Sequence, residues 1–286
     1  MRILAISSSE TYASKRLFAE AGNLNCEFVV MPIVELAEKN FIIEPGEYDV
    51  LYIRNPYVQR SPKYLKDVIS LAKKFKNRGK RVVDEVIADG LLGGGKWDDY
   101  RVLFANSLPI PKTELFSMQS EFLKQDIFIA KWIYGFKGKN VFLVKSGGSL
   151  PGAYPESELM LQEFVNAEYE YKVITAGYKA LPVILKFAIN KKTKRPDFKN
   201  YQVLNISTTA GDHMLAEAVS LAQKAAKILG RELAKTDILE SNGKLYILEV
   251  NRFPGLQSFE ALTKFNVARE FVKYLVSGAK KAYLQN

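Results

Sequence analysis

Short apolar runs alternate with helical segments through the first third of the chain. The apolar runs have the length of buried strands, and the segments between them carry apolar residues at helical spacing. The predicted strands are 2–7, 27–31, 49–53 and 81–84, and the predicted helices are 12–22 and 62–77. This alternation favours a small parallel α/β domain over residues 1–95, which ends in a linker at the triple glycine 93–95.

The pattern changes to short strands and hairpins after a helix at 96–106 and an extended connector at 108–113. A long Ala-rich helix follows Gly211 and ends near Gly230, a residue that suits the left-handed position after a helix. The other predicted elements are strands at 128–134, 140–145, 160–165, 171–176 and 181–189, a hairpin at 236–251 and a helix at 266–278. We therefore expect a second domain over residues 96–286.

The hairpin at 236–251 carries polar side chains on otherwise apolar strands. Glu249 and Asn251 are two residues apart, so they share one face of their strand. The face of Asp237 depends on the loop, because a two-residue Asn-Gly loop would turn it away from Glu249. A three-residue loop at 241–243 would place all three side chains on one face, and Gly243 suits its last position. We expect the three-residue loop.

Two carboxylates and an amide oxygen on one sheet face need a cation between them. Hard oxygen ligands of this kind suit magnesium beside phosphates better than zinc or copper. We therefore predict that Asp237, Glu249 and Asn251 hold a metal. The alternative is that Asp237 or Glu249 faces solvent on a one-sided sheet.

A basic, glycine-containing loop follows a strand lysine, Lys131. Gly135 and Gly138 would let backbone N–H groups approach phosphate oxygens, and Lys137 would neutralise charge. The loop has neither the Walker nor the Rossmann glycine spacing, so it supports neither of those nucleotide-binding folds. Taken alone, the loop is a weak signal, and a plain exposed hairpin turn is the better explanation.

Composition excludes several other kinds of chemistry. The chain has 286 residues, and 41 Lys and Arg against 31 Asp and Glu give a net charge of +10. With one cysteine and one histidine, it has no disulfide framework and no cysteine metal cluster, and it shows no Ser-His-Asp pattern. No run approaches the roughly 18 apolar residues that span a bilayer. We expect a cytoplasmic protein that does not contact membranes.

The basic stretch at 62–81 is the best candidate for a nucleic-acid surface. It lacks the interleaved aromatic residues of a stacking platform, and a solvated amphipathic helix explains its lysines. We therefore do not expect a nucleic-acid partner.

Together these segments resemble the RimK-like carboxylate–amine ligases of the ATP-grasp superfamily. The resemblance covers about residues 80–280 and is most specific at 237–239 and 248–256, which read Asp-Ile-Leu and Leu-Glu-Val-Asn-Arg-Phe-Pro-Gly-Leu. It implies an α/β fold in which a parallel N-terminal domain precedes a two-lobed ATP-grasp domain. The nucleotide-covering lobe would span about 114–162 and the C-terminal lobe about 163–286.

The resemblance also implies a nucleotide site. Lys131 would contact the α- and β-phosphates under the loop 135–140, and Lys96 would be an earlier phosphate lysine. Segment 161–165 resembles the hinge between the lobes, where Glu163 and the backbone of its neighbours hold adenine. The residues implied to bind the nucleotide are Lys96, Lys131, Gly135, Lys137, Gly138, Gln162, Glu163, Phe164, Val165 and Glu170, the last (or Glu168) at the ribose.

Two positions depart from the family pattern. Lys172 and Lys186 stand where the family usually has arginines, and lysine cannot offer the two-pronged hydrogen bonds of arginine. By resemblance, Lys172 would hold phosphates, and Lys186 and Arg252 would act near the transferred phosphate or the acyl carboxylate.

The resemblance implies an enzyme that uses ATP and Mg²⁺, with Mn²⁺ as a possible substitute. It would join an amino acid or small carboxylate to an amine acceptor, for which an acidic peptide or protein is a candidate, and it would be a homo-oligomer. The alternative is a catalytically weak ATP-binding module that regulates or scaffolds a partner.

Overall fold

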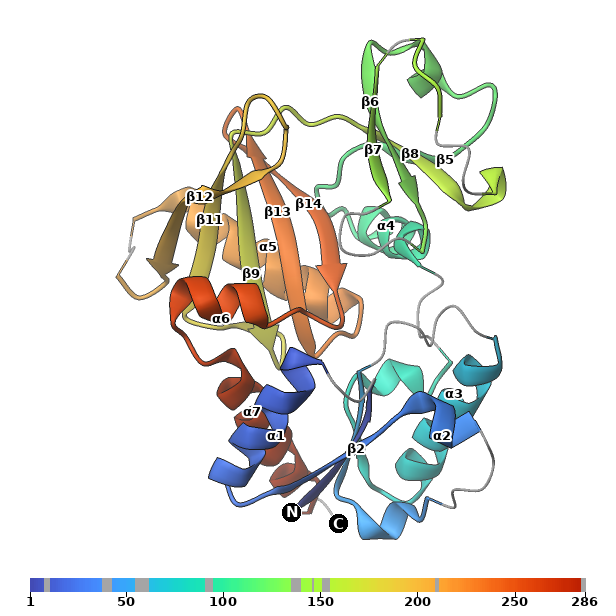
Figure 1. Ribbon diagram of the computed structural model, residues 1–286, viewed down its shortest axis with the longest axis vertical. Helices are drawn as coiled ribbons and strands as arrows, with labels where there is room; N and C mark the ends of the chain where they lie inside the picture. Colours follow the sequence, from blue (N-terminus) through green and yellow to red (C-terminus); the bar gives the residue numbers. More distant parts are fainter. Residues whose placement is uncertain are drawn as a thin grey trace.

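The computed structural model describes residues 1–7, 11–37, 43–54, 62–90, 95–134, 140–145, 147–150, 155–208 and 211–283. Its strands form three separate sheets (Figure 1), one at the N-terminal end and two in the remainder of the chain. The predicted linker glycines 93 and 94 lie outside the described residues.

The N-terminal sheet is parallel, in the order β2-β1-β3-β4. Its strands are β1 (Arg2–Ser7), β2 (Glu27–Met31), β3 (Val50–Arg54) and β4 (Arg81–Val82). The helices around it are α1 (Tyr12–Asn23), α2 (Ile33–Ala37) and α3 (Pro62–Asn77), with short 3-10 turns η1 (Pro45–Glu47) and η3 (Glu85–Ile87). The apolar runs of β1 and β3 are buried, as the sequence predicts for strands covered on both faces.

The central sheet is antiparallel and runs β12-β11-β9-β13-β14, with β10 beside β9. Its strands are β9 (Tyr169–Ala176), β10 (Lys179–Ala180), β11 (Val183–Ile189), β12 (Pro196–Asn205), β13 (Leu233–Ser241) and β14 (Lys244–Asn251). Helix α5 (His213–Ile228) covers one face, where its alanines pack against Tyr171, Ile238 and Ile247. The opposite face is therefore left for other contacts.

A small antiparallel sheet, β5-β8-β6-β7, stands apart from the other two (Figure 1). Its elements are β5 (Thr113–Leu115), β6 (Ile127–Trp132), β7 (Val141–Lys145) and β8 (Leu159–Glu163), with η4 (Glu121–Lys124) and η5 (Glu156–Glu158). Helix α4 (Lys96–Ala105) leads into this sheet. A core of its own, which includes Phe122, Phe128 and Leu161, holds it together.

The chain ends in α6 (Gln257–Thr263) and α7 (Val267–Tyr283). Helix α7 packs on α1, and its Phe271 shares one core with Leu17 of α1 and Leu233 of β13. Arg81 donates to the carbonyls of Tyr274 and Leu275 at 3.1 and 2.8 Å. The C-terminal helix therefore joins the N-terminal sheet to the central sheet. The division at residue 95 stays a prediction.

None of the helices in the described part of the chain combines the length and the apolar character needed to cross a bilayer.

Candidate active site

The hairpin β13–β14 places its acidic side chains together by a route that the sequence did not predict. Ser241 pairs with Lys244, so the loop has two residues, and both Asn242 and Gly243 have positive φ. The predicted three-residue loop is wrong, because Asn-Gly is the preferred pair for a two-residue hairpin turn. A register shift between Asp237 and Ile238 then sets Asp237 opposite Glu249. This β-bulge restores the shared face.

The predicted metal ligands and several lysines lie on the face of the central sheet opposite α5. We call this face the site face. The register pairs Asp237 with Lys172 and Glu249, and Lys235 with Asn251. The charged and amide side chains of this face include Glu170, Lys172, Lys235, Asp237, Glu249 and Asn251.

Lysines balance the carboxylates of the site face. Asp237 is buried, with Lys235 Nζ 3.0 Å from one carboxylate oxygen and Lys172 Nζ 3.4 Å from the other. Lys172 also pairs with Glu170, which is buried beside it. Burial raises the pKa of Glu170, and the positive charge of Lys172 opposes that rise. Each of these two buried carboxylates therefore has a lysine next to it, which offsets the cost of burying its charge.

Glu249 links the site face to α4. Lys96 Nζ lies 3.4 Å from Glu249 Oε2, and Asn251 Nδ2 donates to Glu249 Oε1 at 2.7 Å. Burial disfavours the charged form, but Lys96, Lys235 and Asn251 outweigh it and hold the pKa of Glu249 well below its usual range. Glu249 therefore stays ionised at neutral pH.

The oxygen donors of the site face fit a hard divalent cation. Within the described ranges, no three His, Cys, Asp or Glu side chains form a metal cluster by themselves. Asp237 and Glu249 face each other across paired strands, so a third protein oxygen would come from the Asn251 amide. Two carboxylates and an amide suit Mg²⁺, which commonly takes few protein ligands and completes its shell with water and phosphate.

Lys131 of β6 is buried above the site face. Its ammonium group donates to Gln162 Oε1 and, at 3.3 Å, to Tyr100 Oη. Gln162 in turn donates to Thr113 Oγ1 at 2.8 Å, which fixes its orientation. Burial, followed by the positive charge of Lys96, lowers the pKa of Lys131 to about 7, against the opposing influence of Glu249 and Glu170.

The predicted hinge, residues 161–165, covers the last three residues of β8 and the two residues after it. The backbone N–H of Glu163 donates to the carbonyl of Lys112 at 2.8 Å, and its side chain accepts from the Lys112 N–H at 3.2 Å. Phe164 and Val165 are half-buried in the segment that leads to β9. Glu168 accepts from the Asn242 N–H at 3.1 Å, at the hairpin loop. The loop residues Gly135, Lys137 and Gly138 lie outside the described residues.

Lys186 lies away from the other predicted site residues. It pairs in register with Tyr171, on the face that α5 covers, because successive side chains of a strand alternate between faces. Its ammonium group is 3.0 Å from Glu240 Oε2 and 4.1 Å from the centre of the Tyr169 ring. The structure therefore does not bring Lys186 together with Lys172 and Asp237.

A cavity of about 880 Å³ opens along the site face and extends to the N-terminal sheet. It contains Lys96, Lys172, Glu249, Asn251 and Arg252 of the predicted set. It also contains basic residues outside the predicted set, namely Arg54, Arg231 and Lys235. Lys235 was predictable from its spacing, since it stands two residues before Asp237 on the same strand. Six basic and two acidic side chains line this cavity, which favours an anionic ligand.

Arg252 is buried in a network that joins two sheets. It pairs with Asp84, which follows the N-terminal sheet, and both side chains are 4% exposed. Asp84 Oδ1 accepts from the Glu232 N–H at 2.6 Å, and Glu232 Oε1 accepts from the Asp84 N–H at 2.8 Å. Glu232 also pairs with Arg81 at 2.9 Å. Arg252 therefore has a structural partner as well as a place at the cavity.

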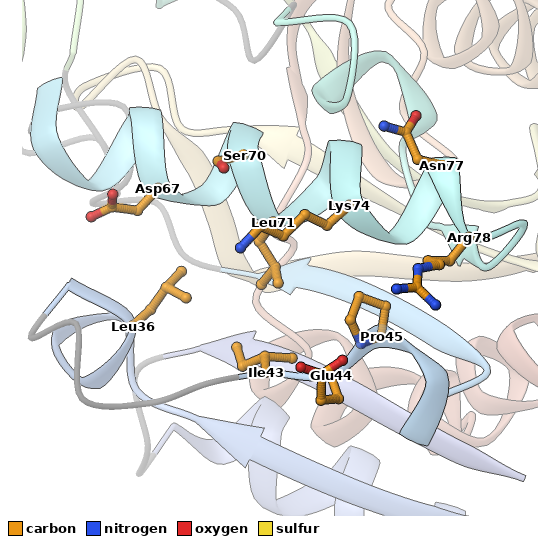
Figure 2. Close-up of a pocket in the computed structure, with 10 residues that line it drawn as sticks. All are labelled: Leu36, Ile43, Glu44, Pro45, Asp67, Ser70, Leu71, Lys74, Asn77 and Arg78. Carbon is orange, nitrogen blue, oxygen red and sulfur yellow. The ribbon is translucent and has the colours of Figure 1, made fainter.

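A second groove, of about 620 Å³, lies between α3 and the segment around residues 43–45 (Figure 2). Lys74 of α3 and Arg78, just after α3, stand across it from Glu44, and Asp67 lies further along the helix. Two basic and two acidic side chains line the groove, so its charge does not favour an acidic ligand. Another lysine of the predicted basic stretch, Lys76, is already paired with Glu85 and Asp89 at 2.9 and 3.1 Å.

Comparison with known proteins places this geometry in a family context. The model of the RimK-like ATP-grasp domain matches residues 94–275. A probable alpha-L-glutamate ligase of Haemophilus ducreyi is 30% identical over 199 residues, which cover 66% of this chain and 64% of that protein. Another, of Legionella pneumophila (strain Corby), is 23% identical over 200 residues, which cover 65% and 64%. The chain thus spans about 64% of the length of these curated relatives.

Solved structures share the fold over nearly the whole chain. The ATP-grasp ligase PsnB complexed with minimal precursor has a TM-score of 0.70 and 14% identity, over 96% of this chain and 98% of that one. D-alanine–D-alanine ligase from Bacillus anthracis has a TM-score of 0.61 and 14% identity, over 100% and 99%. The predicted fold class is confirmed.

Proposed function

Since the chain belongs to the RimK-like ATP-grasp family, we propose that it is an ATP- and Mg²⁺-dependent ligase that joins a carboxylate to an amine. The observation that carries the proposal is the site face, where Asp237, Glu249 and Asn251 stand beside Lys96 and Lys172 at a basic cavity. This arrangement neutralises phosphate and offers oxygen ligands to a metal in one place.

The reaction needs positioning and charge neutralisation more than a protein nucleophile. A substrate carboxylate oxygen attacks the γ-phosphorus of ATP, the bond to the bridging oxygen breaks, and ADP leaves with the electron pair. The amine nitrogen then attacks the acyl carbon and loses a proton as phosphate departs. Lys96, Lys131 and Lys172 would hold the phosphates, and Arg252 would lie near the acyl phosphate.

The remaining nucleotide contacts follow the family pattern. Glu163 and the backbone of Phe164 and Val165 would hold adenine, Gln162 would position Lys131, and Glu170 or Glu168 would reach the ribose. Gly135, Lys137 and Gly138 would cover the phosphates. Asp237, Glu249 and Asn251 would hold Mg²⁺, which would offset the charge of the phosphates when bound. Lys186 is left out of this set, because it lies on the opposite face.

The substrates are an amino acid or small carboxylate and an amine acceptor. The curated relatives are named probable alpha-L-glutamate ligases, and PsnB has been solved with its precursor peptide. Both support an amino-acid or peptide substrate for this chain. We also propose that the small sheet, β5 to β8, is the nucleotide-covering lobe, since it spans Thr113–Glu163. A homo-oligomer and the use of Mn²⁺ stay predictions.

The test of this function is ADP release from Mg-ATP with a mixture of amino acids and with hydroxylamine as a general amine. Hydroxylamine traps an acyl phosphate as a hydroxamate and releases phosphate. We expect ADP and hydroxamate in equal amounts. Tight binding of ATP without ADP release for any carboxylate would contradict a ligase and favour the regulatory alternative.

Lys172 and Lys186 form a matched pair on neighbouring strands, one on each face of the central sheet. We expect Lys172→Met to lower kcat/KM for ATP by about 100-fold, which corresponds to roughly 2.7 kcal/mol of transition-state stabilisation. Lys186→Met should leave kcat/KM within about threefold after correction for folded protein. Steady-state ADP release measures both. An equal loss of kcat/KM in the two variants would contradict the assignment of phosphate binding to Lys172 by its position on the site face.

The binding of ATP should be coupled to the uptake of a proton by Lys131. Its pKa of about 7 makes it mostly neutral at pH 8 in the free protein, and a bound phosphate would raise that pKa. ATP binding at pH 8 should therefore take up a proton, whereas binding below pH 6 should not. Calorimetry at pH 8 in two buffers of different ionisation enthalpy measures this uptake. Lys131→Met should abolish it, and equal binding heats for the unaltered protein in both buffers would contradict the linkage.

A further inference from the structure

The cavity on the site face has an apolar half that the phosphate chemistry does not require. Its walls there come from five separate parts of the chain: α1, β11, β12, the loop before α6, and α6 itself. The side chains that form it include Tyr12, Leu185, Phe187, Phe198, Phe253 and Phe259. The site face thus joins a charged half to an aromatic half within one space.

Phe187 is the point at which the two halves meet. It follows Leu185 on the same face of β11, and Leu185 pairs in register with Lys172. The Lys172 ammonium lies 5.6 Å from the centre of the Phe187 ring. Phe187 itself is fully buried, so a carboxylate held near Lys172 for phosphorylation would have the rest of its molecule against the exposed neighbour of Phe187, which is Phe198.

Phe198 extends this wall outward. Its ring centre is 5.2 Å from that of Phe187, in a tilted arrangement, yet Phe198 remains 58% exposed. Tyr12 stands at the same cavity and is 40% exposed. Exposed aromatic rings that gather at a cavity gain stability when an apolar ligand covers them.

Two of the three arginines of the cavity are already paired with carboxylates of the protein. Arg252 pairs with Asp84, and Arg231 pairs with Asp99. Arg54 donates from Nη2 to the carbonyl of Pro254 at 2.6 Å. A substrate with an acidic side chain would have to compete with Asp84 for Arg252 or with Asp99 for Arg231, whereas an apolar side chain would not.

We propose that the carboxylate substrate of this site carries an aromatic or bulky aliphatic group, which the exposed rings of Phe198 and Tyr12 receive. The proposal rests on the proposed ligase function and names the substrate class of the same site. The reaction is the one given above: the carboxylate is phosphorylated, ADP leaves, and an amine displaces phosphate.

The test compares L-phenylalanine with L-glutamate, each with Mg-ATP and hydroxylamine. We expect kcat/KM for hydroxamate formation to be at least about 30-fold higher with phenylalanine, within the range that an apolar pocket achieves. A preference for glutamate, with ADP released, would overturn the substrate class and leave the ligase function intact. No hydroxamate and no ADP with any carboxylate would overturn the ligase function and this inference with it.

Phe198→Ala tests the wall itself. Because Phe198 is largely exposed, its removal should not disturb folding. We expect kcat/KM for phenylalanine to fall about tenfold, with the KM for ATP unchanged. The matched control is Phe18→Ala on α1, since Phe18 is 61% exposed and does not line the cavity. Equal behaviour of the two variants would overturn the role of the wall.

Discussion

Glu249→Gln is expected to lower kcat for ADP release about a thousandfold, or roughly 4 kcal/mol in the activation barrier. Glu249 is the carboxylate of the site face that is held ionised by Lys96, Lys235 and Asn251. Glutamine keeps an oxygen that can accept from Asn251, so the hairpin should fold normally. It removes the negative charge that a divalent cation needs, and the cation is what offsets charge on the transferred phosphate.

The matched control is Glu240→Gln on the same hairpin. Glu240 lies on the other face of β13, where it accepts from Tyr171 Oη at 2.6 Å and pairs with Lys186. Its replacement should lower thermal stability modestly and leave kcat within about threefold. Titration of ADP release with Mg²⁺ should show a weakened metal dependence for Glu249→Gln alone. If Glu249→Gln retained more than a tenth of the activity, the metal assignment would be wrong.

The sequence predicted the buried and strongly periodic elements better than the exposed ones. Strands β1 and β3 and helix α3 were expected within a residue or two, because apolar runs and helical spacing dominate there. Strand β12 was not expected as a strand. It pairs only with β11, at the edge of the sheet, and most of its side chains are half-buried or exposed, so no alternation marks it.

The site was predictable where two residues on one strand decide a face. The two-residue period of a strand was enough to predict that Glu249 and Asn251 share a face. Asp237 required the register of two strands, which depends on the loop and on any bulge. The loop prediction failed, and the bulge beside Asp237 compensated for it. A bulge shifts the pairing by one residue, and a single sequence carries no reliable signal of where a bulge occurs.

Lys172 and Lys186 show the limit of an argument from family pattern. Both stand near positions where the family usually has arginine. The spacing of residues within each strand does not reveal the register between the two strands, so it cannot tell whether the two lysines share a face. The structure pairs Lys172 with Leu185, so Lys186 must face α5. Lys235 shows the opposite case, since its spacing from Asp237 placed it on the site face although no motif marked it.

The burial of Arg252 leads to the largest expected effect on stability. Arg252→Ala would leave Asp84 only 4% exposed and without its arginine. Removal of one partner of a buried pair costs about 3–5 kcal/mol. For a chain of this size we expect Tm to fall by about 10 °C. Loss of activity in this variant would not by itself show a catalytic role, because unfolding would explain it.

A double variant separates stability from catalysis. In Asp84→Asn with Arg252→Met both charges are gone, so no buried charge is left without a partner. Asp84 has a φ of 58°, in the left-handed region that Asn tolerates well, and Asn can still accept from the Glu232 N–H. We expect Tm to return to within about 4 °C of the unaltered protein, since loss of both partners is often nearly neutral.

The activity of that stable double variant then decides the role of Arg252. If its guanidinium neutralises the acyl phosphate, methionine at this position should lower kcat about 100-fold although the fold is restored. Asp84→Asn alone, which keeps Arg252, should retain most of the activity per folded molecule. Thermal unfolding and ADP release on the same samples measure both quantities. Recovery of activity together with Tm would make Arg252 a residue that joins the N-terminal and central sheets and takes no part in phosphoryl transfer.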